Sequence, residues 1–154
     1  MPDPAATEVL FYHLEQRSLE SVLPSLLQRT LERGWRAVVQ AGSEERVEAL
    51  DTHLWTFAEE SFLPHGTRRD GAAERQPIWL TTGSDNPNGA QVRFLVDGAS
   101  ETDLAAYARA VYLFDGRDPE ATERARAEWK RVKAAGYAVS YWQQSAEGQW
   151  EKKA

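Results

Sequence analysis

A tryptophan surrounded by basic residues near the C-terminus is the constellation in this sequence best suited to bind a ligand. Its four members have the spacing i, i+3, i+4 and i+7, which places them on one side of a helix: Arg126, Trp129, Lys130 and Lys133. A half-exposed aromatic ring beside cations suits an extended ligand with negative charge and an apolar side chain, such as a short acidic peptide. Single-stranded DNA would also suit it, through base stacking and phosphate pairing. The structural alternative is that cations near a helix C-terminus interact with the helix dipole, while their stems cover a tryptophan at the core edge.

A second candidate surface lies in the segment LDTHLWTFAEESFLPHG, residues 50–66. Trp55 and Phe62 belong to a group of large apolar side chains at the point where a helix gives way to a long polar loop. Burying the whole group there is difficult, so the segment predicts an exposed apolar docking surface. The alternative is a small satellite core under the loop.

Residues that could perform catalysis are present, but their spacing matches no recognised site. Neither G-x-G-x-x-G nor G-x-x-x-x-G-K-[ST] occurs, and the first predicted strand is followed by HLEQRS, which lacks glycine. His13, His53 and His65 lack the spacing of metal ligands, and the chain has no cysteine. We therefore expect no catalytic residue, no cofactor and no metal ion. A nucleotide-binding enzyme is the alternative from another functional class.

These residues must be positioned by a chain in which short apolar runs alternate with longer amphipathic ones. The pattern predicts strands at 9–12, 37–39, 78–80, 92–96, 111–114 and 137–142, and helices at 18–33, from 43 onward, at 102–109 and at 118–135. Pro24 lies inside the first helical pattern, so that helix either starts near Pro24 or is kinked there. Strands that alternate with helices predict an α/β fold, with a mostly parallel sheet and helices on both faces. We expect a single domain over residues 1–144 and a loose C-terminal tail over 145–154.

Charge and hydropathy limit the partners and the location. The formal net charge of −6 argues against a duplex-DNA binder, because non-specific affinity for phosphate depends on Lys and Arg. The N-terminal residues MPDPAATEV form neither a basic leader nor an apolar run, and no later run approaches the roughly 18 apolar residues that span a bilayer. We expect a cytoplasmic protein without a membrane segment.

Three segments together resemble a known family. LFYHL near the N-terminus, LDTHLWTFAEESFLPHG in the middle and RARAEWKRVKAAGYAVSYWQQ near the C-terminus are similar, in this order, to the chi subunit of bacterial DNA polymerase III holoenzyme. The resemblance implies a Rossmann-like three-layer domain without a nucleotide-binding loop, acting as a non-catalytic accessory of the clamp-loader assembly. It also implies two partners: the psi subunit of the clamp loader, and the acidic C-terminal tail of single-stranded-DNA-binding protein, which ends in phenylalanine.

The resemblance assigns roles to particular residues. Arg126, Lys130 and Lys133 would meet the acids and the terminal carboxylate of the tail, while Trp129, where the family commonly has tyrosine, would wall the pocket for its apolar end. Phe114, at the end of the preceding strand, is a candidate for the pocket floor. Trp55 and Phe62 match the surface that the family uses for psi or, in some members, for an accessory helicase of the iron–sulfur type.

Overall fold

A twisted sheet forms the centre of the molecule. The computed structural model of the chain describes residues 6–56, 63–101 and 103–154. Across these residues the sheet has seven strands, in the order β3 (Ile78–Thr81), β2 (Ala37–Gln40), β4 (Val92–Leu95), β5 (Arg109–Asp115), β1 (Glu8–Leu14), β6 (Ala138–Gln144) and β7 (Trp150–Lys152). Neighbouring strands pair in parallel, except that β7 runs antiparallel to β6. The predicted, mostly parallel sheet is confirmed.

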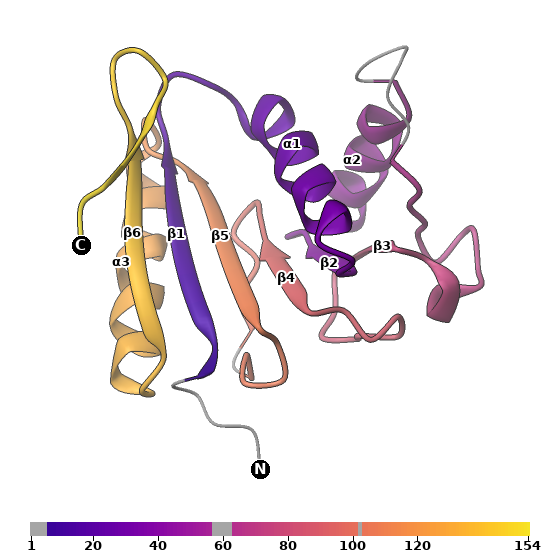
Figure 1. Cartoon of the computed structure of the whole chain (residues 1–154). Coiled ribbons are helices and arrows are strands. Elements are labelled where there is room, and N and C mark those ends of the chain that lie inside the picture. Colours follow the sequence, from indigo (N-terminus) through magenta and orange to yellow (C-terminus); the bar gives the residue numbers. More distant parts are fainter. Residues whose placement is uncertain (1–5, 57–62, 102) are drawn as a thin grey trace.

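Helices cover both faces of this sheet. They are α1 (Leu19–Glu32), α2 (Glu44–Thr56) and α3 (Pro119–Ala134), with a short 3-10 helix, η2 (Ala73–Arg75), before β3. α1 and α2 pack on one face, against β2, β3 and β5, whereas α3 packs on the other, against β1, β5 and β6 (Figure 1). From neighbouring strands the chain therefore departs in opposite directions: β1 leads into α1, and β5 leads into α3. This is the Rossmann-like three-layer arrangement, and ligands of such sheets bind where the strand order reverses.

Helix α1 passes through Pro24 and begins at its predicted cap. Ser18 Oγ accepts the N–H of Ser21 at 3.2 Å. Because Pro24 has no N–H, the carbonyl of Glu20 lacks its usual partner within the helix. His53 Nε2 from α2 lies 2.5 Å from that carbonyl oxygen and takes the place of the missing donor. The helix thus begins at Leu19, directly after its Ser18 cap, and not near Pro24.

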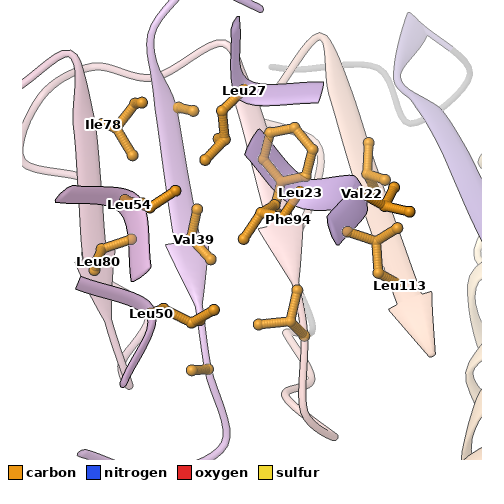
Figure 2. Packing of buried hydrophobic residues seen from close by; sticks show 14 of the residues in the cluster. Val22, Leu23, Leu27, Val39, Leu50, Leu54, Ile78, Leu80, Phe94 and Leu113 are labelled. Atoms are coloured by element: carbon orange, nitrogen blue, oxygen red, sulfur yellow. The ribbon is translucent and has the colours of Figure 1, made fainter. Parts of the chain in front are cut away.

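Among the described residues, the two largest hydrophobic cores lie on the two sides of the sheet. The larger one joins α1 and α2 to the strands, and its central side chains are Val22, Leu23, Leu27, Val39, Leu50, Leu54, Ile78, Leu80, Phe94 and Leu113 (Figure 2). The smaller one lies under α3, which contributes Ala125 and Val132. There Phe11 of β1 stacks on Tyr112 of β5, with ring centroids 4.5 Å apart. Burial of each large side chain contributes roughly 1.5–3 kcal/mol to stability. Because this core is separate from the one under α1 and α2, α3 is held by its own set of contacts.

The predicted helix at 102–109 is wrong. Residue 102 lies outside the described residues, residues 103–108 contain a turn at 105–106 and no helix, and Arg109 already belongs to β5. Hydrogen bonds to distant segments replace helical ones: Leu104 N–H donates to Tyr137 Oη at 3.1 Å, and Tyr107 O accepts from Thr7 Oγ1 at 2.7 Å. Such a short segment has little intrinsic helical stability, so tertiary contacts decide its conformation.

The last ten residues were expected to form a loose tail, but residues 150–152 are strand β7. Trp150 pairs with Gln144 and Lys152 with Trp142 across the β6–β7 hairpin. The Trp150 ring packs against Tyr12 of β1, with centroids 4.6 Å apart. An aromatic contact on the sheet therefore fixes this end of the chain, while the division into one domain and a tail stays a prediction.

Candidate functional site

Helix α3 presents the predicted basic residues on one exposed side. Asp118 caps its start by accepting the N–H of Glu120 at 3.0 Å, and Pro119 occupies the first turn, as the sequence predicts. Ala125 and Val132 face the sheet and are buried. Consequently the helix edge that carries Arg126, Lys130 and Lys133 is exposed to solvent.

Trp129 lies between the core and solvent. Its half-buried ring makes edge contacts with Phe11 (5.6 Å between centroids) and with Tyr141 of β6 (5.7 Å). Lys133 Nζ lies 5.7 Å from the centre of the same ring, which is cation–π range. The ring is therefore fixed on its inner side and available at its outer edge, next to a positive charge.

Phe114 joins the same cluster through Tyr141, a residue that the sequence analysis did not single out. The half-buried Phe114 ring lies 6.1 Å from Tyr141, so the aromatic rings of β5 and α3 both contact the tyrosine on β6. Val139 and Tyr141 pack on the side of the sheet under α3. The period-two alternation of the last predicted strand was the signal that could have identified Tyr141.

A polar network anchors Tyr141. His13 Nδ1 lies 2.6 Å from Tyr141 Oη, and His13 Nε2 lies 3.0 Å from Glu15 Oε1. Burial raises the pKa of Tyr141, so its hydroxyl stays protonated near neutral pH and can donate to His13. Gly116 makes room for the imidazole, because a Cβ there would lie 1.8 Å from His13 Nε2. His13 is thus a supporting residue of the aromatic cluster.

The basic residues around Trp129 divide into two groups. Arg131 is occupied by the fold: its guanidinium pairs with Glu128 at 2.6 Å and donates to the Glu101 carbonyl at 2.8 Å. Arg126 contacts Glu123 at 3.4 Å, and both side chains are exposed. Across the described ranges, no ion pair involves Lys130 or Lys133. Three cations therefore remain for a ligand. We define the α3 surface as Phe114, Arg126, Trp129, Lys130, Lys133 and Tyr141.

A cavity of about 550 Å³ lies beside this surface, at the carboxyl ends of β1, β4 and β5. Phe114 lines it, together with one side of α3 and the start of α1. This is the place where Rossmann-like sheets bind nucleotides. Here, however, five acidic residues and four arginines line the cavity, and one of the arginines, Arg46, is held by Glu20 at 2.7 Å and Asp97 at 3.0 Å. The charge distribution does not favour a phosphate group.

The second predicted surface is only partly described. Trp55 is 49% exposed at the end of α2, and its ring contacts the His65 ring with centroids 4.4 Å apart. His65 is buried, with Nδ1 2.6 Å from the Leu63 carbonyl oxygen and Nε2 3.0 Å from Asp51 Oδ1. Phe62 lies outside the described residues. The structure thus exposes Trp55 on a fixed support.

Neither a membrane helix nor a metal cluster was found in the part of the chain that the structure describes. None of its helices combines the length and hydropathy required to cross a bilayer. Within the same ranges, no group of three or more His, Cys, Asp or Glu side chains has an arrangement that could hold a metal ion.

Comparisons with known proteins agree with the resemblance read from the sequence. The sequence profile of the family described as "DNA polymerase III chi subunit, HolC" matches residues 6–140. A curated protein of Rickettsia prowazekii, named "Probable DNA polymerase III subunit chi", is 29% identical over 94 residues. That match covers 61% of this chain and 55% of the relative, so the chain spans little more than half the length of the curated protein.

Proposed function

This chain belongs to the family of the DNA polymerase III chi subunit, and on that basis we propose that it links the clamp-loader assembly to single-stranded-DNA-binding protein. In this proposal it is a non-catalytic accessory subunit, and the α3 surface binds the acidic C-terminal tail of that protein. The observation that carries the proposal is the combination on one helix edge of a fixed aromatic ring, Trp129, with three cations that the fold leaves available.

The aromatic members of the α3 surface receive the phenylalanine at the end of the tail. Trp129 and Phe114 both contact Tyr141, which the His13 hydrogen bond holds in place. Arg126 and Lys130 pair with the acidic residues and the terminal carboxylate. Exposed ion pairs contribute only about 0–1 kcal/mol each, so the apolar anchor dominates the affinity. The expected dissociation constant is about micromolar, near −8 kcal/mol, and it rises with salt.

The surface around Trp55 is proposed to dock a protein partner, either the psi subunit or an accessory helicase. The support is an exposed tryptophan whose ring rests on a buried histidine, an arrangement typical of an aromatic anchor at an interface. The two surfaces come from different helices, α3 and α2, on opposite faces of the sheet (Figure 1). Both partners can therefore bind at once.

The tail proposal is tested by fluorescence anisotropy with a labelled acidic peptide that ends in Asp-Pro-Phe. The same peptide without its final Phe is the ligand control, and Lys130→Glu is the site variant. Lys152→Glu, an equal charge change at an exposed lysine on β7, is the protein control. We expect Phe-dependent binding that Lys130→Glu weakens about tenfold, and that Lys152→Glu changes less than twofold.

If the peptides with and without the final Phe bound equally well, the proposed aromatic anchor would be wrong. If Lys130→Glu and Lys152→Glu weakened peptide binding equally, the effect would come from the overall charge of the protein and not from the α3 surface. If α3 instead retained a bare oligonucleotide at physiological salt and no peptide, the surface would be a single-stranded DNA site, the alternative function considered from the sequence.

A further inference from the structure

A second surface that combines aromatic and basic residues lies on the opposite face of the sheet from α3. Its aromatic members are Tyr12, Trp35, Trp142 and Trp150, and its basic members are Arg29, Arg33 and Arg109. They come from α1, β1, β5, β6, β7 and the turn after α1, so no local sequence pattern reveals them. We call this set the sheet surface.

Three of the rings form a row across β1, β6 and β7, and Trp35, in the turn after α1, lines the same cavity as Tyr12. Tyr12 and Trp142 are register partners on β1 and β6, so they stand side by side, with ring centroids 6.4 Å apart. Trp150 on β7 contacts Tyr12 at 4.6 Å. All four rings are half-buried, and in the part of the chain that the structure describes, no helix covers β1, β6 and β7 on this face (Figure 1). The row therefore keeps accessible ring surface.

A cavity of about 430 Å³ extends the row at Tyr12 and Trp35. Its floor is apolar, with Leu26, Val92, Phe94 and Val111, and three arginines line it against a single acid, Glu32. This local excess of positive charge contrasts with the net charge of −6 for the whole chain. Its volume falls in the range of ordinary small-ligand sites.

The arginines of the cavity are only partly used by the fold. The guanidinium carbons of Arg33 and Arg109 lie 4.7 and 5.8 Å from the centre of the Trp35 ring. Arg109 has one long contact, 3.5 Å to Glu8, and its buried Nε has no hydrogen-bond partner in the described part of the chain. Arg29 and Arg33 form no ion pair there either. An unsatisfied buried donor beside two unpaired cations indicates a site for an anion.

We propose that the sheet surface binds a short stretch of single-stranded nucleic acid. Bases stack on the row of rings, with one entering the cavity beside Trp35, and phosphates pair with Arg29, Arg33 and Arg109. A row of flat rings beside arginines is the combination that binds single strands without sequence preference, since every base has a face that can stack. A duplex cannot use the rings because its bases are already stacked on one another. This inference goes beyond the proposed tail binding and does not depend on it.

The test is fluorescence anisotropy with a labelled oligothymidylate of about 10 nucleotides, a length within the site sizes of single-strand binders. The site variant combines Arg29→Glu with Arg33→Glu, and both residues are exposed, so the fold should persist. The matched control combines Arg126→Glu with Lys130→Glu on the α3 surface. Both double variants lower the net charge equally, so only the location of the charge differs.

We expect the unmodified protein to bind the oligonucleotide at low salt and to bind a duplex of equal length far more weakly. The variant with Arg29→Glu and Arg33→Glu should lose at least about tenfold in affinity for the oligonucleotide. The variant with Arg126→Glu and Lys130→Glu should stay within about twofold of the unmodified protein. Pairing of the three arginines with about three phosphates predicts a salt slope near −2.1, or a roughly eighteenfold loss between 50 and 200 mM salt.

Three outcomes overturn the inference: no binding at low salt, equal losses in both double variants, or a loss confined to the α3 variant. The same proteins titrated with the acidic peptide separate this inference from the tail proposal. Tail binding should fail only in the α3 variant, so either proposal can fail while the other stands. Peptide binding lost through Arg29→Glu and Arg33→Glu would assign the sheet surface to a protein ligand and contradict our inference.

Discussion

The α3 surface and the sheet surface use the same residue types but are assembled in different ways. On α3, the cations and Trp129 belong to a single helix, and only Phe114 and Tyr141 come from elsewhere. On the sheet surface, the rings and arginines come from α1, from the turn after it and from four strands near both ends of the chain. The first arrangement gives one aromatic anchor beside exposed charges, which suits the end of a peptide. The second gives a row of rings beside two exposed arginines and one partly buried arginine, which suits a chain of bases. The two surfaces contain the same residue types, so we expect different ligands because the residues are arranged differently.

The largest expected difference between the two surfaces comes from removing one tryptophan from each. Trp129→Ala should weaken binding of the Asp-Pro-Phe peptide by about 2 kcal/mol, roughly thirtyfold, because it removes the anchor ring. Trp35→Ala is the matched control, since both rings are half-buried. Each substitution should lower the free energy of unfolding by about 2 kcal/mol, less than for a fully buried ring. Anisotropy and urea denaturation measure the two quantities; an equal loss of peptide affinity in both variants would contradict the assignment.

The next effect concerns the end of the chain. Deleting residues 145–154 removes β7 and the contact of Trp150 with Tyr12. The free energy of unfolding should fall by about 1.5 kcal/mol, because a half-buried tryptophan and a short strand are lost. Urea denaturation of the shortened and complete chains gives the difference. An unchanged midpoint would mean that these residues behave as the loose tail expected from the sequence.

The smallest expected effect is the loss of stability when a tyrosine hydroxyl is removed from each of the two surfaces. Tyr141→Phe removes the hydrogen bond with His13 and should lower the free energy of unfolding by about 1 kcal/mol. Peptide affinity should change less than twofold, since the ring remains. Tyr12→Phe is the control, because in the described part of the chain its hydroxyl makes no hydrogen bond. Similar losses of stability in both variants would contradict the role given to the His13–Tyr141 pair.

Local patterns in the sequence predicted much of the fold and one of the two surfaces. Caps at Ser18 and Asp118 and the helical spacing of Trp129 depend on neighbours within a few residues, so the sequence displays them directly. The helix expected at 102–109 was wrong because hydrogen bonds with Thr7, which donates, and with Tyr137, which accepts, determine that segment.

Pairing over long sequence separations explains what the sequence analysis missed. Tyr141 meets His13 across 128 residues, and Tyr12 meets Trp150 only because β7 closes the hairpin on β6. Sheet register decides such neighbours, and register is not visible in a single sequence. The sheet surface is therefore a property of the folded chain alone.

The central claim, that the α3 surface binds an acidic tail through its terminal phenylalanine, is tested most directly by mapping amide chemical shifts of this protein during titration with the Asp-Pro-Phe peptide. The account predicts shifts that cluster at residues 126–133 and around Phe114 and Tyr141, and that shrink when the final phenylalanine is removed. Shifts at Tyr12, Trp35 and Trp150 instead, or shifts that do not depend on the phenylalanine, would contradict it.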